Sequence, residues 1–139
     1  MDSPSEIEKR FVNNFIRKGR RERSLWALSK AGKKRTEFLN RFHNQWPDLI
    51  DQNKCELWDI TDSNNVLDRI SSQLKLKESD VMYTISYYNT DGQIMHLRNA
   101  LDKSQSKGCA CLLISSDGSK FYFKAEQEVG TPKKYLGMV

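Results

Sequence analysis

Histidine and cysteine are the residue types that most often do chemistry near neutral pH, and this 139-residue sequence has two of the first and three of the second. His43 ends a basic helical segment, where an imidazole complements the negative end of the helix dipole. His96 lies between Met95 and Leu97. Neither histidine has a nucleophile or carboxylate at a spacing typical of a catalytic pair, so we expect structural roles for both.

The cysteines indicate buried thiols rather than a metal site. Cys109 and Cys111 alternate within the most apolar run of the sequence. A zinc site needs a second Cys or His pair at ligand spacing, and a nucleophilic thiol needs an adjacent base in an accessible, electropositive setting. We therefore expect core packing, reduced thiols in a cytoplasmic protein, and no metal or other cofactor.

Several residues near the C-terminus raise the possibility of a metal-dependent nuclease, which brings carboxylates and a lysine together at the end of a strand pair. Asp117, Lys124, Glu126 and Glu128 are the residues available. Asp117 is better explained as a turn residue before Gly118, and Glu126 follows the strand core. A metal-independent nuclease would use His, Arg, Tyr and Lys, and no spacing supports one. We expect no enzymatic activity and no small-molecule substrate.

Positive charge is concentrated between residues 17 and 41. This stretch has ten Lys or Arg against two Glu, a net charge of +8, whereas the whole chain carries +5. Such a density cannot be buried unpaired and attracts anions. Arg23 and Arg35 are less favourable, because their stems can pack on neighbouring aromatic residues. We expect the other eight to contact nucleic acid or an acidic partner: Arg17, Lys18, Arg20, Arg21, Lys30, Lys33, Lys34 and Arg41.

Aromatic residues are interleaved with these cations, as in proteins that stack the bases of single strands. However, Trp26, Phe38, Phe42 and Trp46 fall at apolar helical positions, so we expect them in the core rather than on a stacking surface. The sequence has no recognisable nucleic-acid-binding module such as a helix-turn-helix.

Periodicity predicts the elements that must position these residues. Ser3-Pro4-Ser5-Glu6 is typical of a capping box and begins a helix over residues 4–18. Two further helices end at Gly32 and at Trp46-Pro47. A short strand near residues 55–60 and a helix over 66–74 follow. Alternation then predicts a strand over 81–87. A short helix over 95–108, a buried strand over 109–114 and a hairpin into 120–124 are expected to follow.

These elements predict one α+β domain spanning residues 1–139. An N-terminal helical layer, about 4–45, packs on a small mixed β-sheet of three to four strands within a strand and helix region of about 55–125. We expect the strand–helix–strand unit over 81–115 to be parallel, and the C-terminal tail, 126–139, to leave the sheet. No apolar run approaches a membrane span, and the polar N-terminus is not typical of a signal peptide.

Several segments together resemble a group of small, uncharacterised bacterial proteins. The resemblance covers most of the chain and implies one compact domain, without implying an activity. The segments are Arg21-Glu22-Arg23-Ser24-Leu25, Lys33-Lys34-Arg35, the stretch 38–43, the strand 81–86, Asp91-Gly92-Gln93, the strands 111–115 and 121–126, and Lys134-Tyr135-Leu136.

Without a catalytic set, the chain is expected to act by binding another macromolecule. The first hypothesis is a protein partner, in a role of the immunity, antitoxin or defence-accessory type. Inhibitors of basic toxins are usually acidic, whereas this chain is basic overall, with a net charge of +5, which counts against this hypothesis. Residues 51–101 nevertheless have eight acidic against five basic side chains, which predicts an acidic face on the sheet side. The alternative is nucleic acid on the basic helices, and a metal-independent nuclease ranks third.

Overall fold

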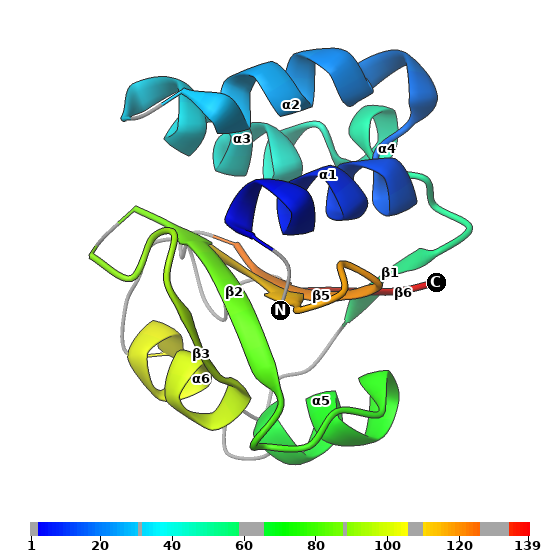
Figure 1. Ribbon diagram of the computed structural model, residues 1–139. Coiled ribbons are helices and arrows are strands. Elements are labelled where there is room, and N and C mark those ends of the chain that lie inside the picture. Colours follow the sequence, from blue (N-terminus) through cyan, green and yellow to red (C-terminus); the bar gives the residue numbers. More distant parts are fainter. Residues whose placement is uncertain (1–2, 31, 59–65, 88, 106–109, 126–133) are drawn as a thin grey trace.

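Three layers make up the part of the chain that the computed structural model describes, which is residues 3–30, 32–58, 66–87, 89–105, 110–125 and 134–139. A β-sheet forms the middle layer (Figure 1). The N-terminal helices α1 to α4 cover one face of this sheet, and α5 and α6 cover the other. The α+β class with an N-terminal helical layer is therefore confirmed.

The helices and strands follow the chain in a simple order. The helical layer comprises α1 (Pro4–Phe15), the 3₁₀ turn η1 (Lys18–Arg20), α2 (Arg21–Ser29), α3 (Lys33–Asn44) and α4 (Trp46–Leu49). The remaining elements are β1 (Cys55–Trp58), α5 (Val66–Leu74), β2 (Val81–Ser86), β3 (Ile94–His96), α6 (Leu97–Gln105), β4 (Cys111–Ser115), β5 (Lys120–Lys124) and β6 (Lys134–Met138).

The sheet is larger than predicted and is not mixed. Its six described strands lie in the order β1-β6-β5-β4-β2-β3, and every neighbouring pair is antiparallel. The predicted parallel pairing of the strands around 81–115 is wrong, because the short strand β3 intervenes and reverses the chain before α6. The parallel crossover is instead β3–α6–β4, whose two strands run in the same direction on either side of β2.

The C-terminal segment also differs from the prediction. Instead of leaving the sheet, residues 134–138 form β6 between β1 and β5. Gly137 lies under the ring of Phe121, which occupies the space that a Cβ atom would take. The glycine therefore lets an aromatic side chain of the next strand pack on the backbone, which a pattern of apolar residues alone does not predict.

The first helix begins as predicted and ends earlier. The Ser3 side chain accepts a hydrogen bond from the Glu6 amide, and Pro4 occupies the first turn. The helix stops at Phe15, since Ile16 is extended and forms a β-bridge with Ile50. This bridge fixes the end of α1 beside the chain that leaves α4.

An aromatic cluster fills the space between the helical layer and the sheet. Phe11, Phe15 and Phe42 from the helices surround Phe121 at ring-centroid distances of 4.8 to 5.4 Å, in edge-on geometry. Phe38 and Phe42 are thus core residues as predicted. The opposite face of the sheet packs against α5 and α6 through a second apolar cluster. Cys111, in β4, is fully buried, as expected for this thiol.

Candidate functional site

The helices α2 and α3 present a strip of cations along their outer side. α2 packs mainly on α1 and α3 and lies farthest from the sheet (Figure 1). Arg20, Arg23, Trp26 and Lys30 are spaced by three, three and four residues, so they follow one side of α2. Seven residues, about two turns, separate Lys34 from Arg41 on α3. We call these six residues the α2–α3 strip.

One end of the strip is a cavity of about 220 Å³. Three arginines line it together with two polar groups, and two buried apolar side chains contribute the rest of the lining. The lining residues are Arg20, Arg23, Ser24, Phe38, Arg41, Gln45 and Leu49. The cavity therefore lies between the first turn of α2, the C-terminal part of α3 and the end of α4.

The arginines of this cavity have no carboxylate partner among the described residues. The ion pairs in the described part of the chain involve other residues. They join Lys34 to Glu37, Arg35 to Glu8 and Asp91, and Arg98 to Glu78. The hydroxyl of the buried Ser24 donates to the carbonyl of Arg20, which fixes the backbone at the start of α2. Three positive charges thus share one small cavity, and this arrangement attracts an anion.

Trp26 occupies the middle of the strip and is exposed. Its exposed fraction is 49%, so the expectation that Trp26 belongs to the core is wrong. α2 instead buries Ser24, Ala27 and Leu28. The Nζ atoms of Lys30 and Lys34 lie 5.6 and 6.0 Å from the centre of the Trp26 ring, within the range of cation–π attraction. The result is an exposed indole flanked by two lysines.

The other predicted binding residues are distributed differently. Arg17 Nε donates to the Ile50 carbonyl and Arg21 Nε to the Ile16 carbonyl, so both arginines stabilise the connection after α1. Lys18 and Lys33 are exposed and lie outside the strip as defined here. The cavity brings together Arg20 and Arg41 from the predicted set, and adds Arg23, which the prediction left out.

Arg35 points inward and holds three elements together. Its Nη1 donates to Glu8 Oε2 at 2.6 Å, its Nε to Asp91 Oδ2 at 2.8 Å and its Nη2 to the Tyr83 hydroxyl at 2.7 Å. The Tyr83 hydroxyl donates to Glu8 at 2.6 Å. Burial alone would lower the pKa of Arg35, but Asp91 and Glu8 raise it overall. Burial and Glu8 raise the pKa of Tyr83. The four side chains form a charged clamp between α1, α3 and the β2–β3 hairpin.

Of the residues considered for catalysis, the described His96 and Asp117 each bond to neighbours in their own part of the fold. The exposed His96 bonds through Nδ1 to the Ser79 carbonyl at 2.7 Å, and the side chain of His43 lies outside the described part. Asp117 accepts hydrogen bonds from Ser115 and Ser119 within the β4–β5 turn, as expected of a turn residue. Partial burial would raise the pKa of Asp117, but these bonds lower it overall. Cys109, Glu126 and Glu128 lie outside the described residues.

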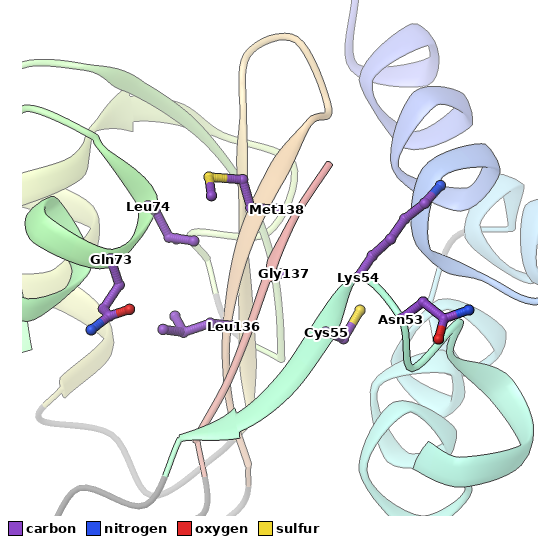
Figure 2. A pocket seen from close by; sticks show the side chains of 8 residues that line it. All are labelled: Asn53, Lys54, Cys55, Gln73, Leu74, Leu136, Gly137 and Met138. Atoms are coloured by element: carbon purple, nitrogen blue, oxygen red, sulfur yellow. The ribbon is translucent and has the colours of Figure 1, made fainter.

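A second cavity, of about 260 Å³, lies between α5, β1 and β6 (Figure 2). Lys54 extends away from it toward α1 and donates to the Asn14 carbonyl. Burial raises the pKa of the Cys55 thiol to about 12, so this thiol is protonated and unreactive near neutral pH. Leu74, Leu136 and Met138 make part of the lining apolar. This cavity lacks the charge that distinguishes the first.

In the described ranges, no group of three or more His, Cys, Asp or Glu side chains is placed to hold a metal ion. No helix among the described residues combines the length and apolar character that crossing a membrane requires.

Comparison with known proteins gave no match to any family model, curated protein or solved structure. The resemblance to small bacterial proteins therefore stays a prediction. The strip itself had one detectable sign in the sequence, because Arg20, Arg23 and Lys30 repeat at the spacing of one helix side. That α2 would bury Ser24 rather than Trp26 had no such sign.

Proposed function

We propose that the chain is a non-enzymatic protein that binds single-stranded nucleic acid along the α2–α3 strip. The observation that carries this proposal is the exposed Trp26 between Lys30 and Lys34, next to the arginine-lined cavity. Single-strand binders combine cations for the phosphates with aromatic rings on which bases stack. The strip offers both groups on one continuous surface.

The dimensions of the strip suit a short single-stranded segment. Ten residues separate Arg20 from Lys30, which corresponds to about 15 Å along a helix axis. This is the length of a few nucleotides. Stacking on one indole contributes about 1–3 kcal/mol per base, and it does not depend on base identity. The expected binding is therefore of modest affinity and has little sequence preference.

The hypothesis of a protein partner now ranks second. Protein interfaces have an apolar centre rich in aromatic residues. The large apolar side chains exposed among the described residues are Trp26, Ile94, Met138 and Val139, and they lie on three different elements or their ends. Asp91, counted toward an acidic face, is paired with Arg35. These positions favour nucleic acid over an immunity-type or antitoxin-type partner.

Fluorescence anisotropy with labelled single strands of mixed sequence tests the proposal. Neutralising each phosphate changes the slope of log affinity against log salt by about 0.7 for single strands. The five cations of the strip predict a slope of about −3.5 on this basis. Replacing Arg20, Arg23 and Arg41 by Glu should flatten the slope by about 2 and weaken binding of all sequences alike.

A charge-matched variant provides the control. Arg69, Lys77 and Lys103 are exposed and lie on or beside the helices of the opposite layer. Reversing these three changes the net charge by the same amount but leaves the strip intact, so the slope should stay at its wild-type value. Equal loss of binding in both triple variants would show that only net charge matters and would contradict the assignment of the strip.

A further inference from the structure

The cavity at the end of the strip is closed on one side by the chain itself. Gln45 follows the last turn of α3, and Leu49 ends α4. Both line the cavity together with the three arginines. A nucleic-acid strand that lies along α2 from Lys30 toward Arg20 therefore reaches Gln45 and Leu49 at this end of the strip. This geometry suits the end of a nucleic-acid strand better than a nucleic-acid strand that continues beyond the cavity.

Charge in the cavity comes from the arginine side chains. The first turn of α2 and the last turn of α3 meet here with opposite dipoles, which offset each other. Arg20, Arg23 and Arg41 contribute three guanidinium groups, each a planar fork of N–H donors that pairs with phosphate oxygens in bidentate geometry. A phosphomonoester presents three terminal oxygens and up to two negative charges, whereas an internal phosphodiester presents two such oxygens and one charge.

The volume of the cavity also limits what it can hold. Pockets for drug-sized ligands measure about 300–1,000 Å³, whereas this cavity measures about 220 Å³. A phosphate group with part of its sugar fits such a volume, but a whole nucleotide does not. The buried side chains of Phe38 and Leu49 lower the local polarity of the cavity. A charge-assisted hydrogen bond formed in the cavity is stronger for this reason.

From these observations we infer that the cavity binds the terminal phosphate of a single-stranded nucleic acid. The inference rests on the proposed function and deepens it, since the protein would then recognise the phosphorylated end of a strand and would stack the adjacent base on Trp26. The shared chemistry is a phosphomonoester, which a strand carries at either its 5′ or its 3′ end.

Three oligonucleotides of one sequence, each with an internal fluorophore, test the inference by anisotropy at fixed salt. One carries a 5′-phosphate, one a 3′-phosphate and one hydroxyl groups at both ends. We expect one phosphorylated strand to bind at least ten-fold more tightly than the unphosphorylated strand. The end whose phosphorylation strengthens binding, 5′ or 3′, identifies the phosphate that the cavity binds. Equal affinity for all three strands would overturn the inference but leave the proposed function standing.

Paired variants separate the cavity from the rest of the strip. The double substitution Arg23→Gln, Arg41→Gln should abolish the preference for the phosphorylated end, because two of the three guanidinium forks are lost. The double substitution Lys30→Gln, Lys34→Gln should weaken binding of all three strands by a similar factor and keep the preference. A preference that survives the arginine substitutions would place the phosphate elsewhere and overturn the inference.

The comparison of the three strands on the wild-type protein needs no variant, so the inference is testable even if a substitution impairs folding. If no strand binds at low salt, the proposed function itself fails, and this outcome is distinct from equal binding of all three.

Discussion

Replacing Arg35 by Met should destabilise the protein by about 3 kcal/mol. The side chains of Arg35 and Glu8 are 11% and 10% exposed, and the guanidinium of Arg35 faces the Glu8 carboxylate. Removing one partner of a buried ion pair typically costs about 3–5 kcal/mol, because the other charge stays buried without compensation. The lower end of this range applies, since Tyr83 still donates to Glu8 and Asp91 is partly exposed.

Urea denaturation followed by circular dichroism measures this loss. For a chain of this size a change of 3 kcal/mol corresponds to a fall in Tm of about 10 °C. The double variant Glu8→Leu, Arg35→Met removes both charges, and apolar replacements of buried pairs are often neutral. We therefore expect the double variant to be more stable than Arg35→Met alone.

A surface pair supplies the control. Arg98 and Glu78 form an ion pair of 3.1 Å but are 61% and 58% exposed. Exposed pairs contribute about 0–1 kcal/mol, so Arg98→Met should leave the stability nearly unchanged. A loss of less than 1 kcal/mol in Arg35→Met, or a double variant less stable than the single one, would refute the view of a buried clamp.

Three other substitutions give separate tests. Gly118 has φ +74°, and a Cβ there would lie 2.5 Å from Arg10 Cβ, whereas Gly92 has φ +77° and open space around it. In urea titrations Gly118→Ala should thus cost about 1–2 kcal/mol more than Gly92→Ala. Burial lowers the pKa of Lys134, so its charged form destabilises the fold at neutral pH; this penalty begins to fall as pH rises past the lowered pKa and is gone only above the ordinary lysine pKa of 10.5. Lys134→Met should consequently raise the urea midpoint at pH 7, and this advantage should shrink toward pH 10; an advantage that grows with pH would contradict the assignment. Trp26→Ala should weaken single-strand binding about 5- to 150-fold but leave Tm nearly unchanged, since the side chain is half exposed.

Local patterns in the sequence predicted the features that depend on near neighbours. The Ser3 cap, the Asp117-Gly118 turn and the buried strand, predicted over 109–114 and found at Cys111–Ser115, each follow from residues a few positions apart. The strand β6 was not predicted, because it is short, contains Gly137 and is defined by pairing with strands on both sides. Long-range pairing of this kind has no local sign.

The candidate site likewise combines features that have a local sign in the sequence with contacts between distant residues that have none. The concentration of cations was visible in the sequence, but the clamp was not, because Arg35 is 27 residues from Glu8 and 56 from Asp91. The position of Trp26 was mistaken, because hydrophobicity favours burial of a Trp over Ser24. In the folded chain Ser24 is buried and lines the cavity together with Phe38 of α3, and its hydroxyl donates to the Arg20 carbonyl.

The most direct test of the central claim is to follow the indole N–H signals of the protein by two-dimensional ¹H–¹⁵N NMR during titration with a single-stranded oligonucleotide. The chain has three tryptophans, and the signal of Trp26 is assigned by its absence in Trp26→Phe. We predict that the Trp26 signal shifts or broadens most, together with the Nε–H signals of Arg20, Arg23 and Arg41. Shifts confined to other residues, or no shifts at saturating oligonucleotide, would contradict the assignment of the α2–α3 strip as a nucleic-acid-binding surface.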